Sequence, residues 1–439
     1  MRTNVLYSGL LSDYFEIIAF KTLSKVDTIL GSNQHEFNGD HALKELFRLC
    51  NNTTFEKKQI YSTFIYLNED ESQNILQDAF LTWYNARAKS HDKTGRSEYR
   101  LYYQTNDATK RMKKGDFLAI ARKNDVFHVI IAQHNSTAEK QIMWLFGVEK
   151  IEDNNKFQIK KIQNTNNKVT FASRFILDIL GIKVQELNEN YLEIMQKRFD
   201  NKIPSTSELS QFTLELMQKE IDPIEEPDVA IVRLFEKEEV LYKTLERIKI
   251  VHKLQNSFIE NNNVDVDSFL QFSLSIQNAR KSRAGKALEN HLSFIFNANK
   301  VMYTHSGITE NKSKPDFIFP NIAKYHDIHF ADTGLSMLAS KTTCKDRWRQ
   351  ILSEAKRIKK KHLFTLEPSI SENQTQEMKS NDLTLVLPNE IKATYTINQQ
   401  QDIINLKDFL LLVKTRQNKY INLKYRCNKL IVGSSNHRH

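Results

Sequence analysis

The chain has 439 residues, enough for two or three domains that each bury a core, so a single domain is not expected. Its formal net charge of +10 favours a polyanionic partner, nucleic acid before a membrane, because no amphipathic or lipid-anchor segment accompanies the charge. Three scattered cysteines argue against a disulfide framework or a zinc cluster, and the absence of a signal-peptide core or a run of about 18 apolar residues predicts a cytoplasmic protein without a membrane partner.

The first 190 residues are predicted to form a mostly β domain, a barrel or pseudobarrel with few helices. Short runs rich in β-branched and aromatic residues alternate there with Asn, Asp and Gly turns. We expect strands at residues 61–67, 117–121, 126–132 and 142–146.

One segment of this domain, residues 82–103, alternates basic and aromatic side chains. Basic groups neutralise phosphates and aromatic rings stack or pack, so the segment is a candidate for docking into a DNA groove. A solvated hairpin with its rings in the core explains the same pattern and, from charge alone, is the more common case.

Turn and breaker residues mark residues 191–228 as a linker, with a short helix at 208–219. The remaining chain, 229–439, is predicted to be an α/β domain. Apolar spacing predicts helices at 229–251, 266–279, 282–296 and 346–360, and strands at 317–319, 336–340, 363–366 and 383–387.

Two residues of this domain fit the chemistry of phosphodiester hydrolysis. Asp316 begins one predicted strand and Lys341 ends the next. Hydrolysis needs a divalent cation held by hard oxygen ligands and a cationic group near the phosphate, which an aspartate and a lysine supply. Taken alone, a Pro-Asp turn followed by a surface lysine is a common pattern without catalytic meaning.

One carboxylate holds a metal poorly, so a second acid is expected two residues before Lys341. Ala339 stands at that position. Glu354 lies on the following predicted helix, near one stripe with Arg347 and Ile351, and its carboxylate could point back to the strand end. A solvent-exposed glutamate among lysines is the alternative.

The segments 283–289, 314–320, 325–327, 341–352 and 362–366 resemble the C-terminal domain of the EcoRII-like type II restriction endonucleases. The resemblance implies a restriction-endonuclease-like (PD-(D/E)XK) core whose second acid is relocated to the next helix. It makes Asp316 and Glu354 the Mg²⁺ ligands and Lys341 the catalytic lysine. It also places Glu289 and Tyr325 near the active site as additional catalytic residues.

The same resemblance assigns Lys345, Asp346 and Arg347 to base recognition in a CC:GG half-site. An aspartate accepts a hydrogen bond from cytosine N4, and Lys or Arg donates to guanine O6 and N7 in the major groove. Without the resemblance, Asp346 would be interpreted as an ordinary helix N-cap.

Residues 84–87, 93–94 and 96–100 are similar to the recognition segment of the family's effector-binding domain, a B3-like pseudobarrel. By that resemblance, effector DNA is bound by five residues of this segment: Arg87, Lys93, Arg96, Glu98 and Arg100.

We therefore expect a multidomain α+β protein: a B3-like domain (1–190), a linker (191–228) and an EcoRII-like catalytic domain (229–439). The expected activity is Mg²⁺-dependent cleavage of double-stranded DNA at a short CC/GG-containing site, with a second site copy as allosteric effector. A near-palindromic site calls for a homodimer, with 229–296 as the candidate interface. The alternatives are a structure-specific or repair nuclease on the same core and a non-catalytic B3-like DNA-binding regulator.

Overall fold

Contacts divide the chain into two compact units, residues 7–185 with 369–374, and residues 186–368 with 375–439 and the first six. Both contain helices and sheets, which confirms the predicted α+β class. No helix among the described residues is long and apolar enough to cross a membrane. The computed structural model describes residues 9–28, 35–47, 57–87, 97–152, 154–163, 168–184, 191–200, 202–260, 263–344 and 347–419.

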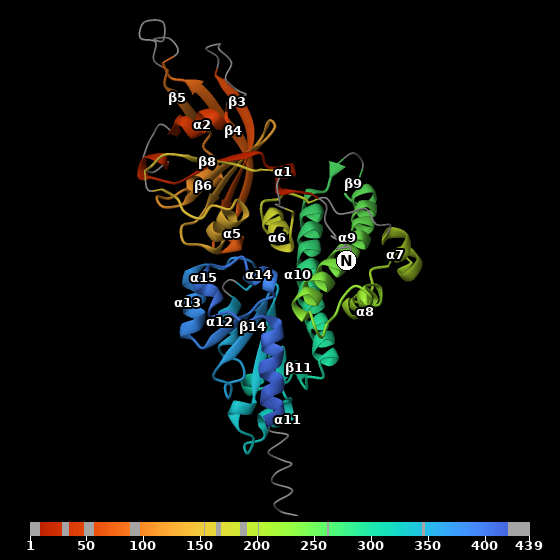
Figure 1. Cartoon of the computed structure of the whole chain (residues 1–439). Coiled ribbons are helices and arrows are strands. Elements are labelled where there is room, and N and C mark those ends of the chain that lie inside the picture. The colour runs from red at the N-terminus through yellow and green to blue at the C-terminus, as the bar shows by residue number, and fades with distance from the viewer. Residues whose placement is uncertain are drawn as a thin grey trace, which may run out of the picture. The chain divides into compact units, whose positions relative to one another are not determined.

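The first unit is built on an eight-stranded sheet of order β2-β5-β4-β3-β7-β6-β1-β8 (Figure 1). All neighbours are antiparallel except β3 and β7, which are parallel. The strands are β1 (Ile17–Thr22), β2 (Glu36–Asn38), β3 (Lys58–Leu67), β4 (Ile75–Asn85), β5 (Tyr99–Tyr103), β6 (Phe117–Lys123), β7 (Val126–Ala132) and β8 (Gln158–Lys161).

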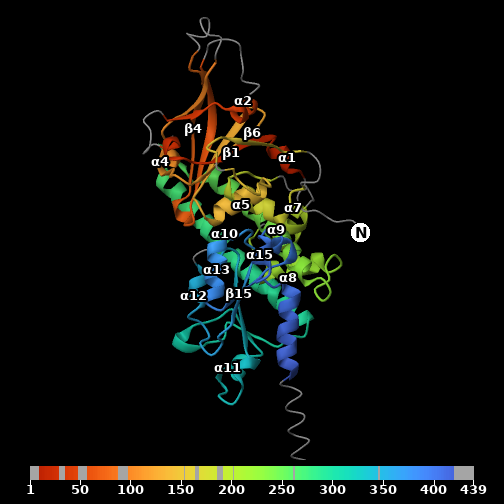
Figure 2. The ribbon, with the colours of Figure 1, turned by 60° about the vertical axis from the view of Figure 1, so that its left-hand side comes forward.

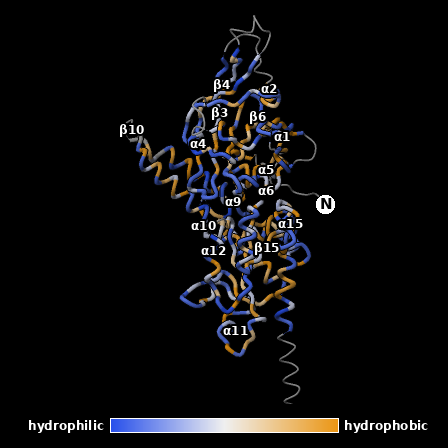
Figure 3. Tube along the Cα trace, turned by 90° about the vertical axis from the view of Figure 1, so that its left-hand side faces the viewer, coloured by the Kyte–Doolittle hydropathy of each residue, from blue (hydrophilic) through white to orange (hydrophobic). Residues whose placement is uncertain are grey.

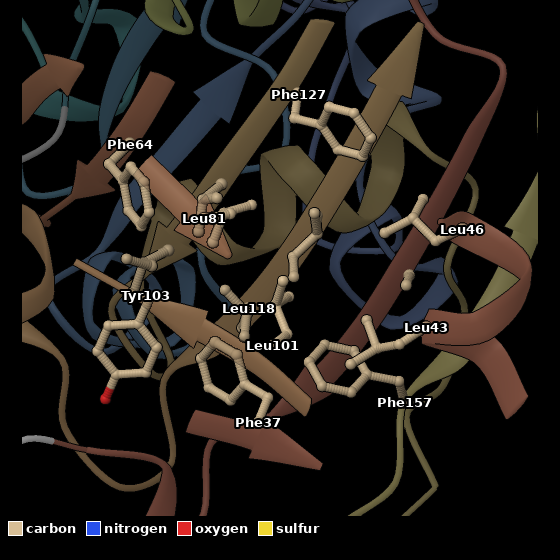
Figure 4. Packing of buried hydrophobic residues seen from close by; sticks show 14 of the residues in the cluster. Phe37, Leu43, Leu46, Phe64, Leu81, Leu101, Tyr103, Leu118, Phe127 and Phe157 are labelled. Atoms are coloured by element: carbon tan, nitrogen blue, oxygen red, sulfur yellow. The ribbon is translucent and has the colours of Figure 1, made fainter. Parts of the chain in front are cut away.

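This sheet curls around an apolar core until its two edges meet (Figure 4). The ring of Phe37, on edge strand β2, lies 5.7 Å from the ring of Phe157, which precedes the opposite edge strand β8. The Phe157 backbone N–H also donates to the Asp40 carboxylate at 2.6 Å. Side chains rather than a ladder of backbone hydrogen bonds close the sheet, and the predicted pseudobarrel is thereby confirmed.

Five helices accompany the sheet among the described residues of this unit, and one of them corrects a predicted strand. Residues 142–145 belong to a helix and Phe146 is its C-cap, because Ser136 caps the helix start, accepting from Glu139 N at 3.1 Å, and Ala138, Ile142 and Leu145 are buried at helical spacing. The helices are α1 (Leu11–Tyr14), α2 (His41–Leu46), α4 (Asp107–Arg111), α5 (Thr137–Leu145) and α6 (Phe171–Ile179).

The described part of the second unit begins with four helices, and the last two form a long antiparallel pair. The break expected near residue 280 does not exist, because one helix runs through both predicted ones, and Gly285 lies inside it with open space around its Cα. Side-chain contacts join the two long helices: buried Glu238 lies 2.8 Å from buried His291, and Glu246 accepts from the exposed Arg280 at 2.7 Å. The helices are α7 (Tyr191–Phe199), α8 (Thr206–Met217), α9 (Pro227–Asn256) and α10 (Val266–Ala298).

A five-stranded mixed sheet of order β11-β12-β13-β14-β15 follows (Figure 2). The first three strands are antiparallel neighbours and the last three are parallel. On one face, Phe317 and Phe319 pack against Phe296 of α10 at 5.1 and 5.3 Å, and Phe319 also packs against Phe409 at 5.6 Å. The strands are β11 (Thr304–His305), β12 (Phe317–Phe319), β13 (Ser336–Lys341), β14 (Lys361–Thr365) and β15 (Leu383–Val386).

The remaining helices of this unit are mostly short, and one prediction about them is wrong. The helix expected at 346–360 is helical only at α12 and continues as turns, because Ala355 adopts a left-handed conformation with φ +44°. The helices are α11 (Ile322–His326), α12 (Trp348–Ile351), α13 (Glu372–Ser380), α14 (Asn389–Lys392), α15 (Ile397–Gln400) and residues 406–419.

Candidate active site

Asp316 and Lys341 meet at one end of the five-stranded sheet. Strands β12 and β13 are antiparallel, with Phe317 opposite Leu338. The start of β12 and the end of β13 therefore lie at the same end of the sheet. The Asp316 Oδ2 atom accepts from Ser340 N at 2.7 Å and lies 3.2 Å from Lys341 Nζ. The strand ladder therefore fixes a carboxylate and an ammonium side by side.

Glu354 lies in the turns after α12 and interacts electrostatically with both Asp316 and Lys341. Burial, followed by the negative charge of Asp316, raises the pKa of its carboxyl to about 7, although Lys341 and Lys361 act in the opposite direction. Among the described residues, no group donates a hydrogen bond to the Glu354 carboxylate. This half-buried acid thus lacks the partners that normally stabilise a carboxylate at neutral pH.

The donor set fits a hard divalent cation. Two carboxylates that repel each other, one of them short of hydrogen-bond donors, are stabilised when a cation binds between them. No three His, Cys, Asp or Glu side chains within the described part of the chain form a ready-made metal cluster. Any metal here would therefore draw ligands from Asp316 and Glu354 and complete its shell with water or substrate oxygens.

Glu289 and Tyr325 lie near this centre but are bound to other groups. Glu289, on α10, contacts His305 of β11 at 2.8 Å, and Ser306 N donates to the Asp316 backbone carbonyl at 2.9 Å. The Tyr325 hydroxyl, on a side chain only 1% exposed, donates to the Glu310 carboxylate at 2.6 Å.

Glu310 is a residue that sequence reasoning missed. It lies on a short 3-10 turn (Glu310–Lys312) between β11 and β12, and nothing in its local spacing marks it. Besides accepting from Tyr325, its Oε2 atom accepts from Lys356 N at 3.3 Å. Only the tertiary structure brings this acid beside the segment that carries Glu354.

Of the residues assigned to base recognition, Lys345 and Asp346 lie outside the described residues. Arg347 is described, is exposed, and occupies the N-cap position of α12. The neighbouring Trp348 is fully buried, so Arg347 is held at the surface by an anchored side chain.

In the first unit, the candidate effector contacts form a chain of alternating charges across β2, β5 and β4. Arg87 Nε lies 2.7 Å from Glu98, and Arg100 pairs with Glu98 at 2.7 Å and with Glu36 at 2.8 Å. The Tyr84 hydroxyl donates to Glu36 as well. Glu36 was not predicted, because only the pairing of β2 with β5 brings it to Arg100.

Two further candidates, Lys93 and Arg96, lie outside the described residues. The hydrogen bonds from Arg100 and Arg87 lower the pKa of Glu98, so this acid stays ionised. The described part of the surface is therefore a pre-formed polar array rather than a simple positive patch.

Comparisons with known proteins find similarity to restriction endonucleases. Residues 242–410 match the family model described as EcoRII C terminal. The type II restriction enzyme EcoRII of Escherichia coli is 35% identical over 232 residues, covering 52% of this chain and 55% of that protein. The chain thus matches about half the length of this curated relative.

Two solved structures are similar at 17% sequence identity. Metal-depleted Ecl18kI in complex with uncleaved DNA gives a TM-score of 0.42, covering 52% of this chain and 84% of that one. A complex of restriction endonuclease PspGI with substrate DNA gives a TM-score of 0.40, covering 54% and 100%. Asp316, Lys341 and Glu354 all fall within residues 242–410, the segment that matches the EcoRII C-terminal family model.

Proposed function

We propose that this protein is a type II restriction endonuclease that hydrolyses double-stranded DNA with Mg²⁺ at a short CC/GG-containing site. One observation supports this most: Asp316, Lys341 and Glu354 converge at one end of a mixed sheet inside a segment that matches the EcoRII C-terminal family model. The sequence identity to EcoRII supports the same activity.

The chemistry follows from these three side chains. Asp316 and Glu354 would hold Mg²⁺, which when bound offsets charge on the phosphate and acidifies water. Lys341, fixed 3.2 Å from Asp316, is placed to donate to a phosphate oxygen. In the reaction a water oxygen bonds to phosphorus, one P–O ester bond breaks, and the released oxygen takes up a proton.

We assign recognition of the DNA bases to Lys345, Asp346 and Arg347, because of the family resemblance and the surface position of Arg347. A structure-specific or repair nuclease would not need this triplet. Replacing Asp346 with Ala would abolish sequence-selective cutting if the triplet reads the site, and would change little in a repair nuclease.

The first unit is proposed to bind a second copy of the site as an effector through Arg87, Lys93, Arg96, Glu98 and Arg100. We keep the expected division into an effector domain (1–190), a connecting segment (191–228) and a catalytic domain (229–439). The ordered acid-base array at Glu98 and Arg100 supports base-specific contact over simple phosphate neutralisation.

A near-palindromic site also calls for a homodimer, and the long helix pair offers a surface for it. The end of the α9 and α10 pair next to the β9 (Ile259–Glu260) and β10 (Asn263–Val264) hairpin lies away from the five-stranded sheet, with apolar residues along it (Figure 3). Five apolar side chains there are 43–60% exposed: Val251, Leu254, Val266, Leu270 and Leu274.

The activity is tested by incubating the full chain with unmethylated phage DNA and Mg²⁺ and sequencing the cut ends. Cuts at one short motif, stimulated by added site-bearing duplex, support the proposal. A smear without motif would favour the repair nuclease. Intact DNA, with specific binding retained, would favour the non-catalytic regulator.

A further inference from the structure

The position of Glu354 needs an explanation, because no helix supports it. The α12 helix ends at Ile351, and Ala355 has φ +44°, so the intervening turns make only local backbone bonds, such as Glu354 N to Ile351 O at 3.1 Å. For one cation to bind both acids, the Glu354 carboxylate must be held close to Asp316. Such turns alone do not hold a side chain firmly enough for this.

Two side chains from other segments hold the backbone directly after Glu354. The Glu310 carboxylate accepts from Lys356 N at 3.3 Å, and the Tyr325 oxygen accepts from Arg357 N at 3.4 Å. Both oxygens of Glu310 lie 2.6 Å from the Tyr325 hydroxyl, so the two side chains brace each other.

The ionisation states of Glu310 and Tyr325 favour the hydrogen bond between them. Burial acts to raise the pKa of Glu310, but hydrogen bonds from Tyr325 and from backbone groups outweigh it and lower the pKa overall. Burial, followed by the Glu310 hydrogen bond, raises the pKa of Tyr325. Around neutral pH, Glu310 is therefore an acceptor and Tyr325 a donor, as their hydrogen bond requires.

Arg357 extends the contact to a longer segment. One guanidinium nitrogen donates to the backbone carbonyls of Tyr325 and Asp327. Another donates to the Phe330 carbonyl and to the Asp332 carboxylate, each at 2.7 Å. The guanidinium thus binds the whole connection from α11 toward β13, the strand that ends at Lys341.

We propose that Glu310, Tyr325 and Arg357 form a clamp that sets the distance between the Glu354 and Asp316 carboxylates. The clamp rests on the proposed function, because a set distance matters only if both acids bind one cation. It gives Tyr325, buried and bound to Glu310, a positioning role in place of direct contact with DNA. Glu310 acts through the Lys356 backbone in the same way.

The test measures metal binding directly, with Mn²⁺ as the probe, by electron paramagnetic resonance titration of the full chain. Glu310→Gln and Tyr325→Phe each remove a partner while keeping the size of the side chain. We expect about tenfold weaker Mn²⁺ binding in each variant, the lower end of what lost supporting bonds around metal ligands cost. Saturating metal should restore the rate of DNA cleavage in both, because the ligands themselves are intact.

A matched control is Lys324→Ala, which breaks a partly exposed ion pair with Asp327 at 2.7 Å in the same segment without touching Glu354. It should bind Mn²⁺ like the unmodified protein. If the two clamp variants also bind Mn²⁺ normally while the unmodified protein binds it and cuts DNA, the clamp is refuted and the proposed function stands.

Two other results would also overturn the clamp. If Glu310→Gln abolishes Mn²⁺ binding as completely as Asp316→Asn, with no rescue at high metal, Glu310 is a ligand itself. If the unmodified protein neither binds Mn²⁺ nor cuts DNA, the proposed function fails and the clamp with it.

Discussion

If Glu354 binds a metal as proposed, its raised pKa makes that binding depend on pH in a range where ordinary glutamates do not titrate. Only the ionised carboxylate binds a cation, so protons compete with metal below the pKa. With a pKa of about 7, roughly nine-tenths of Glu354 is ionised at pH 8 and about one-tenth at pH 6. The apparent dissociation constant for Mn²⁺ should therefore rise about tenfold from pH 8 to pH 6.

The assay is a Mn²⁺ titration of the full chain at half-unit pH intervals at constant ionic strength. Glu354→Gln should bind Mn²⁺ weakly and lose most of the pH dependence, whereas Glu220→Gln, at an exposed position, should titrate like the unmodified protein. A dissociation constant that stays the same between pH 8 and pH 6 would refute the reasoning, because it would mean that Glu354 ionises like a solvated acid or binds no metal.

Three further results are expected. Lys341→Ala should lower the DNA cleavage rate at least about 100-fold in a plasmid-cutting assay, whereas Lys379→Ala, which removes only an exposed ion pair with its partner acid, should cut normally. Leu274→Glu should weaken dimers at least about tenfold in sedimentation velocity; a monomeric unmodified protein would contradict the proposed interface. Phe296→Ala should lower the free energy of unfolding by about 3–5 kcal/mol in urea, with little effect from Ile397→Ala, whose side chain is 79% exposed.

The strands were largely predictable because their signal is local. The runs 117–121 and 126–132 combine β-branched residues with nearby turns, and the structure places β6 and β7 over them. The apolar runs of the second unit likewise correspond to β12, β13, β14 and β15. Such runs fit a buried strand between turns whatever the tertiary context, so the sequence alone was sufficient there.

Besides the break near residue 280, which α10 runs through, two elements were mispredicted, for different physical reasons. The apolar run 142–146 is compatible with a strand and with a helix. The N-cap Ser136, six residues upstream, stabilises the helix. The segment after α12 has helical spacing, but Ala355 adopts a left-handed conformation that alanine rarely prefers. Tertiary hydrogen bonds to Glu310 and Tyr325 accompany that conformation, and no local pattern could have shown them.

The same turns explain how a site can work with Ala339 where an acid is expected. Ala339 and Lys341 are two residues apart on β13, so they project from the same face, and an acid at 339 would be placed by the strand itself. With alanine there, the carboxylate must come from a segment that has no ladder to hold it. The buried side chains of Ala355 and Ile358 anchor this segment to the core, and Arg357 ties it to the connection before β13. With the acid relocated, side-chain contacts rather than backbone pairing determine where the carboxylate lies. We therefore expect substitutions in the clamp to weaken metal binding more than substitutions elsewhere on the same surface.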